Sequence, residues 1–134
     1  MSPKINWPKP EPERLRTPIG EAWIQDGVLW HRLDSGIAIS EKDALDTISS
    51  LADIVGDDRY PAVVDMRGAA FADSKSRSRF AHDIGFEQAT ALIVDSKVSK
   101  ALGNLYMRLA RPNRPTKMFN SEGPASQWAQ DHRT

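Results

Sequence analysis

The feature that most constrains this chain is a short apolar run, residues 61–64, which ends in the charged residues Asp65 and Arg67. The chain then passes through Gly68 and reaches a helix-start signal at Ser74. A strand that ends in polar residues and leads into a helix places those residues at the carboxyl edge of an α/β sheet, where ligands usually bind. The segment therefore predicts an α/β fold, provided that further strands and helices alternate elsewhere in the chain.

The composition is that of a single globular domain. A chain of 134 residues can bury roughly two thirds of its unfolded surface, and 40% hydrophobic residues are too many for a disordered chain. Eighteen basic residues balance eighteen acidic ones, so no overall field attracts nucleic acid or an anionic membrane. Cysteine is absent, which excludes disulfides, thiolate metal sites and a cysteine nucleophile. The sequence has neither a membrane span nor the apolar core of a signal peptide, so we expect a cytoplasmic protein.

The beginning of the chain differs from the rest because five of the nine prolines lie within residues 1–19. Proline at this density removes backbone donors and favours extended chain. We therefore expect an extended arm over residues 1–19 and one folded domain over residues 20–134. Trp7 in the arm either stays in solvent as part of a floppy tail or docks on its own domain or on a neighbouring copy.

Strand-like and helix-like segments alternate after the arm. Asp26 and Gly27 lie between two β-prone runs and predict a hairpin, because a type I′ turn needs positive φ at both central positions. The periodicity then predicts helix, strand, helix, strand, helix, strand and helix over residues 41–55, 61–65, 74–84, 89–94, 97–109, 116–120 and from 124 on. Strands that alternate with helices imply parallel pairing with right-handed crossovers. We expect a mixed sheet of about five strands with an antiparallel hairpin strand at one edge, and about four helices.

Polar residues follow three of the predicted strands: Asp65 and Arg67, Asp95 and Ser96, Asn120 and Ser121. The ends of parallel strands lie on one edge, so these six residues either form a binding cluster or are solvated strand ends and helix caps. Between Ser96 and Ser121 there is no acidic residue, whereas basic residues accumulate there: Lys97, Lys100, Arg108, Arg111, Arg114 and Lys117. This stretch is either a solvated basic face or a contact for an anionic headgroup, a phosphorylated partner or the acidic first helix of another copy. The candidate ligand or anion contacts are Asp95, Ser96, Lys100, Arg108 and Asn120.

The motifs of common catalytic sites are absent. The sequence has no Gly-x-Ser-x-Gly elbow, no Walker loop, no His-Glu-x-x-His and no Gly-x-Gly-x-x-Gly. His82 and Asp83 are neighbours on a predicted helix, where adjacent side chains diverge. His31 lies on a strand with no second ligand-type residue nearby, so we expect a packed or surface group. A receiver-type phosphoacceptor at Asp65 would need further carboxylates for Mg²⁺, which the first strands do not supply. We therefore predict no enzyme, no cofactor and no metal site.

The central stretch resembles the STAS domain, the fold of the SpoIIAA-type anti-sigma factor antagonists and of the cytoplasmic domains of sulphate transporters. In that family a strand ends in a motif like DLSGVxFMDSSGLG, and this chain reads DMRGAAFADSKS. The matching positions are Asp65, Phe71, Asp73 and Ser74, while Gly68 matches many members of the family. The order of elements is similar over most of the chain after the arm. The ending around Phe119 and Trp128 also resembles small bacterial STAS-like proteins of unassigned function, some grouped loosely with CRAL-TRIO lipid-binding domains.

The chain departs from the family's motif at the position of regulation. In the antagonists the regulatory phosphate goes on the second serine of Asp-Ser-Ser, and Lys75 occupies that register here. Ser74 precedes it, and its hydroxyl at a helix start can accept phosphate or cap the helix. The following Gly-Leu-Gly is replaced by Ser76, Arg77 and Ser78, which removes small residues from the surface that contacts partners. The resemblance therefore implies the fold rather than a working phosphoswitch.

The resemblance favours a non-enzymatic module that binds or regulates another protein. Its expected working surface is the loop after residue 65 with the start of the next helix: Arg67, Phe71, Asp73, Ser74, Lys75, Arg77 and Arg79. One alternative is a binding protein for a small apolar or lipid-like anionic ligand, which predicts a sizeable apolar cavity beside Tyr106, Arg108 or Trp128. Another alternative is a self-associating structural protein, which pairs through the Trp7 arm or through the hairpin edge strand.

Overall fold

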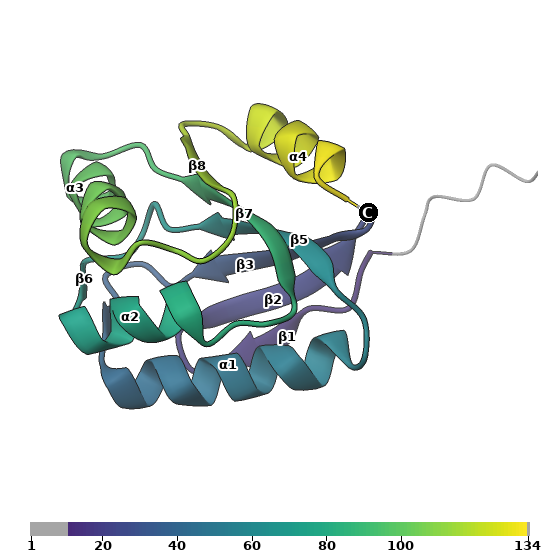
Figure 1. Cartoon of the computed structure of the whole chain (residues 1–134), viewed down its shortest axis with the longest axis horizontal. Coiled ribbons are helices and arrows are strands. Elements are labelled where there is room, and N and C mark those ends of the chain that lie inside the picture. Colours follow the sequence, from purple (N-terminus) through teal and green to yellow (C-terminus); the bar gives the residue numbers. More distant parts are fainter. Residues whose placement is uncertain (1–10, 134) are drawn as a thin grey trace, which may run out of the picture.

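Strands and helices alternate along the chain in the computed structural model, which describes residues 11–133 (Figure 1). The elements are β1 (Leu15–Thr17), β2 (Gly20–Gln25), β3 (Val28–Leu33), β4 (Ala38–Ile39), α1 (Glu41–Val55), β5 (Tyr60–Asp65), β6 (Phe71–Ala72), α2 (Ser74–His82), β7 (Glu87–Ile93), α3 (Lys97–Leu105), the π-helix η1 (Tyr106–Ala110), β8 (Thr116–Phe119) and α4 (Glu122–Asp131). Six of these strands form one sheet in the order β1-β2-β3-β5-β7-β8, and β4 pairs with β6 in a separate parallel ladder. In the main sheet, β1 to β3 are antiparallel and β3, β5, β7 and β8 are parallel. The predicted α/β fold with a mixed sheet is therefore confirmed.

The main sheet has one strand more than predicted, because β1 forms its edge. Leu15 pairs with Ala22 and Thr17 pairs with Gly20. Pro18 lies in the tight turn between the two strands, a position that suits its fixed φ. The folded part of the chain therefore begins by Leu15, inside the segment that the sequence assigns to an extended arm. Trp7 and the rest of residues 1–10 lie outside the described residues.

The hairpin of β2 and β3 has the turn that the sequence predicts. Asp26 and Gly27 take φ values of 53° and 73°, as a type I′ turn requires. The turn sets a register in which Trp23 pairs with Trp30 across the two strands. Their ring centroids lie 6.0 Å apart, with planes 3° from parallel. This stacked pair adds to the stabilisation from buried area and so holds the register of the antiparallel strands.

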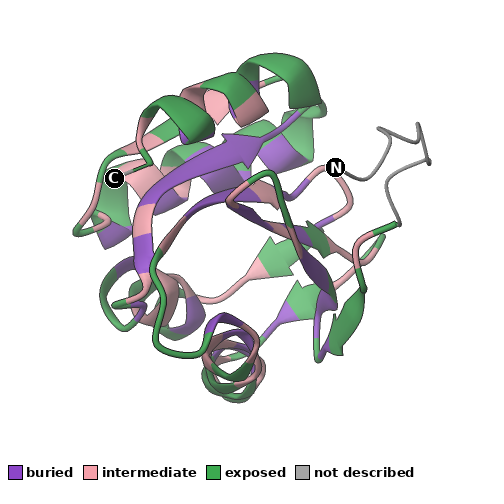
Figure 2. Ribbon diagram, turned by 90° about the vertical axis from the view of Figure 1, so that its right-hand side faces the viewer, coloured by how far each residue is buried: buried purple, intermediate pink, exposed green. Residues whose placement is uncertain are grey.

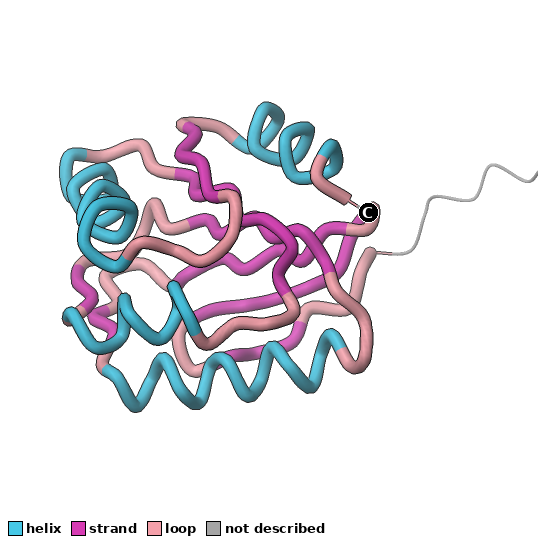
Figure 3. The backbone as a smooth tube through the Cα atoms, in the orientation of Figure 1, coloured by secondary structure: helices cyan, strands magenta, loops and turns pink. Residues whose placement is uncertain are grey.

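Helices cover both faces of the main sheet (Figure 1 and Figure 3). On one face Ala129 of α4 packs in a cluster with Val63 of β5. On the other face α1 and α2 lie side by side, and Val55 of α1 packs with Ala62 of β5. Successive strand residues point to opposite faces, so the neighbours Ala62 and Val63 contact different helices. The central strands are consequently buried, while the helices expose their outer sides (Figure 2).

Three helix starts are capped by side chains, and one cap differs from the prediction. Ser40 before α1 and Ser96 before α3 accept hydrogen bonds from backbone N–H groups at 3.2 and 3.0 Å. For α2, Asp73 rather than Ser74 is the cap, and its carboxylate accepts from the N–H of Ser76 at 2.7 Å. Both residues are good caps, and only the backbone shows which one precedes the first helical turn. Ser74 is therefore the first residue of α2.

Helix α2 and the helix predicted over residues 97–109 also differ from their predicted extents. The segment predicted as one helix over residues 97–109 is divided into α3 and the π-helix η1, which ends where Arg111 takes a φ of 52°. Helix α2 ends at His82, before Ile84. Within residues 11–133, no helix has both the length and the apolar character needed to cross a membrane.

The loop after β5 touches the loop after β3, and Gly68 makes this contact possible. Gly36 donates a hydrogen bond to the carbonyl of Gly68 at 2.6 Å, and Ala70 donates to Ile37 at 2.9 Å. A Cβ atom on Gly68 would lie 2.8 Å from the Cα of Ser35 and 3.1 Å from its nitrogen. Both of these atoms are backbone, so a side chain fits only if one loop moves. The glycine thus brings β6 beside β4.

We expect the substitution Gly68→Ala to lower the free energy of unfolding by about 1–3 kcal/mol, because it forces the two loops apart. Gly123→Ala is the matched control, since a Cβ there meets nothing within 4 Å. In the first turn of α4 alanine replaces a poor helix former, so stability should stay the same or rise by up to about 1 kcal/mol. Urea unfolding followed by circular dichroism compares the two variants. Equal stability of both would contradict the role assigned to Gly68.

Candidate functional site

The interaction site predicted from the sequence lies at β6 and the start of α2. Phe71 is 55% exposed, although large apolar residues are usually buried. Ser74 and Lys75, the first two residues of α2, are exposed as well. Within the described chain, the Ser74 hydroxyl and the Lys75 ammonium make no hydrogen bond or ion pair. We refer to Phe71, Ser74 and Lys75 as the Phe71 surface.

Asp73, between Phe71 and Ser74, has a structural task in this segment. Its carboxylate accepts the N–H of Ser76, and this hydrogen bond lowers the pKa of Asp73. The same interaction removes the structural explanation for Ser74, whose hydroxyl is not needed as a cap. Within this segment Asp73 is therefore a cap, whereas Phe71, Ser74 and Lys75 are exposed.

Arg67 joins the end of β5 to α4 instead of pointing to the Phe71 surface. Its guanidinium donates to both carboxylate oxygens of Asp65, at 2.9 and 2.8 Å, and to Glu122 of α4 at 3.0 Å. Burial alone would raise the pKa of Asp65, but the hydrogen bonds from Arg67 outweigh burial and lower it. The bond to Asp65 also raises the pKa of Arg67. Arg32 lies 3.5 Å from Asp65, so the predicted strand-end carboxylate is already neutralised within the domain.

The other two arginines of the predicted surface are also engaged inside the domain. Arg79 donates to Glu41 of α1 at 3.2 Å and to Asp83, the residue after α2, at 2.9 Å. These bonds raise the pKa of Arg79 and fasten α2 to the beginning of α1. Arg77 donates to the carbonyl of Ala72. The arginines therefore hold the segment in place, while the Phe71 surface remains open to solvent.

The second predicted set of contacts is not assembled into one site. Asp95, Ser96, Lys100, Arg108 and Asn120 are all exposed. The strand ends do lie on one edge of the sheet, but within residues 11–133 no side-chain hydrogen bond or ion pair joins any two of these five residues. The bond from the N–H of Lys100 to the carbonyl of Ser96 at 2.9 Å belongs to the backbone of α3. The same part of the chain has no group of three His, Asp or Glu side chains that could hold a metal ion.

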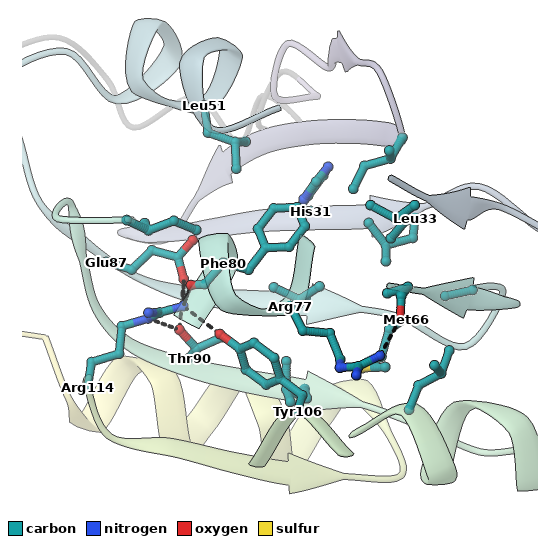
Figure 4. A pocket seen from close by; sticks show the side chains of 18 residues that line it. His31, Leu33, Leu51, Met66, Arg77, Phe80, Glu87, Thr90, Tyr106 and Arg114 are labelled. Atoms are coloured by element: carbon teal, nitrogen blue, oxygen red, sulfur yellow. Dashed lines mark hydrogen bonds and ion pairs between the residues drawn. The ribbon is translucent and has the colours of Figure 1, made fainter. Parts of the chain in front are cut away.

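Arg114, which the sequence places in the basic stretch, is in fact buried at the centre of a polar network (Figure 4). Its side chain is 6% exposed and lies 3.4 Å from the carboxylate of Glu87. It donates to the hydroxyl of Thr90 at 2.7 Å and to that of Tyr106 at 3.2 Å. It also donates to two carbonyl oxygens in the last turn of α2, at 3.0 and 3.2 Å. One cation thus connects β7, α2 and η1.

Burial controls the ionisation of this network. It raises the pKa of Glu87, an effect that Arg114 and Thr90 oppose. It also raises the pKa of Tyr106 to about 12, so the phenol keeps its proton. Sequence reasoning missed Glu87 altogether and assigned Arg114 to the surface. The sequence does show an acidic residue, Glu87, at the start of an apolar strand. This pattern does not identify Arg114, which lies far along the chain, as its partner.

The Arg114 network closes one end of a cavity between the main sheet and helices α1, α2 and α3 (Figure 4). The cavity has a volume of about 90 Å³. Its walls are mainly apolar and include Leu33, Leu51, Val64, Phe80, Leu92 and Leu102. Tyr106 is also in the wall, so the structure contains a cavity beside one of the three residues where the ligand-binding alternative expects one.

His31 of β3 lines the same cavity and is 4% exposed, so it is packed rather than on the surface. Its Nε2 lies 2.9 Å from the hydroxyl of Thr17, and that hydroxyl donates to the carbonyl of Gly20 at 3.2 Å. Because the Thr17 proton is used in this way, the pattern assigns the ring proton to Nε2 and leaves Nδ1 as an acceptor. Burial lowers the pKa of His31 to about 4, so the imidazole is neutral at pH 7.

The chain belongs to the family described as "Domain of unknown function (DUF7793)", whose model matches residues 22–133. No curated protein matches it. Among solved structures, it is similar to an uncharacterized protein of the DUF3478 family with a SpoIIAA-like fold from Shewanella loihica PV-4, with 12% identity over 89% of this chain and 92% of that one and a TM-score of 0.56. It is also similar to a protein with unknown function from Arthrobacter sp. FB24, with 30% identity over 78% and 92% of the two chains and a TM-score of 0.30. The first similarity shows the SpoIIAA-like fold that the STAS resemblance implies, whereas the family shown is DUF7793.

The substitution Arg114→Met should lower the free energy of unfolding by about 3–5 kcal/mol, because it leaves the Glu87 carboxylate buried without its cation. Glu87→Gln should cost less, since Arg114 keeps its bonds to Tyr106, Thr90 and the carbonyl oxygens of α2. In the double variant the charge is gone, so its stability should exceed that of Arg114→Met alone. Denaturant unfolding of the three variants measures this order. A more severe loss for Glu87→Gln than for Arg114→Met would overturn the assignment.

The stability of the protein should fall as the pH drops from about 6.5 to about 4, partly because of His31. The folded pKa is about 4 and the unfolded pKa is 6.5, so the unfolded state binds more protons in this window and is favoured there. His31 alone lowers the free energy of unfolding by roughly 3 kcal/mol over this window, and its contribution changes little at still lower pH. Urea unfolding at pH 7 and pH 4.5 measures it. The variant His31→Phe should lose correspondingly less, and equal losses in both proteins would refute the expectation.

Proposed function

We propose that this member of the DUF7793 family is a non-enzymatic interaction module and that it binds a partner protein through the Phe71 surface. The observation that carries the proposal is the exposure of Phe71, a residue that is 55% exposed on a short strand. Aromatic side chains supply much of the binding energy in protein interfaces, because they bury a large area while losing few rotamers. An exposed phenylalanine held on regular structure is the kind of residue from which such an interface is built.

The backbone around Phe71 is fixed on both sides, which favours binding. Phe71 donates to the carbonyl of Ile37 at 3.3 Å and pairs with Ala38 in the parallel ladder. Two residues later, Asp73 donates to the carbonyl of Ile39 at 3.2 Å. A side chain on an ordered backbone loses little conformational entropy when a partner covers it. Phe71 therefore needs no rearrangement of the chain to act as an anchor.

Ser74 and Lys75 provide a polar rim beside this anchor. Lys75 stands in the register where SpoIIAA-type antagonists carry their phosphorylated serine, so this chain has a fixed positive charge there. The positive end of the α2 dipole lies at the same place and adds to it. We infer that the partner presents an acidic group next to an apolar pocket. Because residue 75 is a lysine, binding does not require a phosphoserine at this position.

The arginines of this segment support the fold of the domain, and we assign none of them to the interface. Arg67 and Arg79 bind carboxylates on α4 and α1. Reversing their charge would disturb these helices, so the loss of a partner in such variants would not identify the contact surface. Substitutions of Phe71 and Lys75 are more specific, because neither side chain supports another element.

The substitution Phe71→Ser should reduce partner binding at least about tenfold, because the anchor is lost while the fold is kept. Affinity capture from cells of the source organism, quantified by mass spectrometry, measures the partner bound to the tagged protein. Lys75→Glu should slow association and remove the salt dependence of binding, since it deletes the attraction to an acidic group. Surface plasmon resonance with the captured partner measures both effects.

The matched control is Leu109→Ser, because Leu109 is 63% exposed on η1 and is equally apolar. This variant should bind the partner as the unmodified protein does. Loss of binding in both variants would point to general apolar adhesion, and retention in both would reject the Phe71 surface. Light scattering of the purified protein shows whether the partner is a second copy, in which case Phe71→Ser should halve the mass.

A further inference from the structure

We infer that the cavity between the sheet and helices α1, α2 and α3 is a binding site for a small, uncharged, mostly apolar molecule that donates one hydrogen bond, such as a phenol or a small alcohol. The guest would donate to Nδ1 of His31. This site lies inside the domain and does not depend on the function proposed for the Phe71 surface.

The exposure of Val64 shows that this part of the interior is not filled. Val64 lies on β5, a strand with neighbours on both sides, and both Val63 and Asp65 beside it are buried. Val64 itself is partly exposed and lines the cavity. Protein interiors are normally packed as densely as organic crystals, with few voids larger than a water molecule. A residue in the middle of a covered sheet therefore remains accessible because of the cavity next to it.

His31 gives the cavity an unused polar group. In residues 11–133, its Nδ1 has no hydrogen-bond partner, since the only bond of the ring is that of Nε2 to Thr17. The described chain does not fully enclose Nδ1, so this atom borders open space. The open space beside His31 is the cavity, into which the side chain extends from β3 (Figure 4). A neutral imidazole nitrogen in this position accepts a hydrogen bond from whatever donor enters the cavity, which is water or the hydroxyl of a guest.

The size of the cavity limits the guest to a small molecule. About 10–15 Å³ of such volume holds one water molecule, so 90 Å³ corresponds to a compound with a single ring. Pockets for drug-sized ligands measure roughly 300–1,000 Å³. A long lipid chain therefore does not fit, while the apolar walls favour a hydrocarbon body.

The remaining charges in the wall favour an uncharged guest. Glu87 and Arg114 neutralise each other, and Arg114 is further bound by Thr90 and Tyr106. Arg77 already donates to the carbonyl of Ala72. A buried carboxylate ligand would be close to the Glu87 carboxylate and would lose its hydration, which is costly without a dedicated partner. A hydroxyl needs only the one acceptor that His31 provides.

Titrations with phenol, toluene and benzoate test the inference on the full chain. Methyl and amide NMR spectra should show saturable binding of phenol, with shifts centred on Val64, Leu92 and Leu102 of the cavity wall. Toluene has nearly the same shape but no donor, so it should bind about five- to tenfold more weakly, which is the usual effect of one hydrogen bond. Benzoate should not bind. Tighter binding of benzoate than of phenol would overturn the choice of an uncharged donor.

The variant His31→Phe keeps a ring but removes the acceptor. It should lose the preference for phenol over toluene while toluene still binds, which separates loss of the hydrogen bond from loss of the fold. An unchanged preference for phenol would reject His31 as the acceptor. The variant Val64→Ile fills part of the cavity and should weaken both ligands about fivefold without lowering the melting temperature. Val63→Ile, on the opposite and fully packed face of the sheet, should lower the melting temperature. If neither phenol nor toluene binds the unmodified protein, the cavity is not a ligand site.

Discussion

The buried cation of Arg114 is the interaction on which the arrangement around the cavity depends. A guanidinium that has left water must find several acceptors, and this one is satisfied by groups from three separate elements. Glu87 and Thr90 on β7, Tyr106 on η1 and the last carbonyl oxygens of α2 all converge on it. Since the carbonyl end of a helix is negative, the cation also favours the position of α2. Each element is thereby fixed relative to the others by directional bonds.

The directional bonds of Arg114 hold α2 in place at one end of the cavity, so the apolar packing beneath the helix can remain incomplete. Helix α2 contributes few apolar side chains, with Phe80 and Ala81 as the main ones, so it cannot fill the space above β5 and β7 by itself. Arg79 ties α2 to Glu41 of α1, and Arg114 ties its end to β7. The helix is therefore held over the sheet by charges, and the 90 Å³ cavity remains beneath it.

The fold could be predicted from local sequence patterns, whereas the polar core could not. The apolar run before Asp65 and the turn residues Asp26 and Gly27 act through neighbours in the chain, so strand β5 and the hairpin lie where the sequence puts them. Arg114 follows several basic residues, and nothing local distinguishes the one that turns inward. A cavity is likewise a property of packing between distant elements. The sequence predicts one surface from Arg67 to Arg79, but only the structure shows that Arg67 binds Glu122 of α4.

The two-residue strand β6 connects the outer surface with the interior. Because side chains alternate along a strand, Phe71 points to solvent and Ala72 lines the cavity. The paired strand β4 repeats this division, with Ala38 exposed and Ile39 in the cavity wall. The same short ladder therefore presents Phe71 on its outer side and forms part of the cavity wall on its inner side. The ladder rests on the close approach of the two loops at Gly68, so one glycine helps to position both the Phe71 surface and part of the cavity wall.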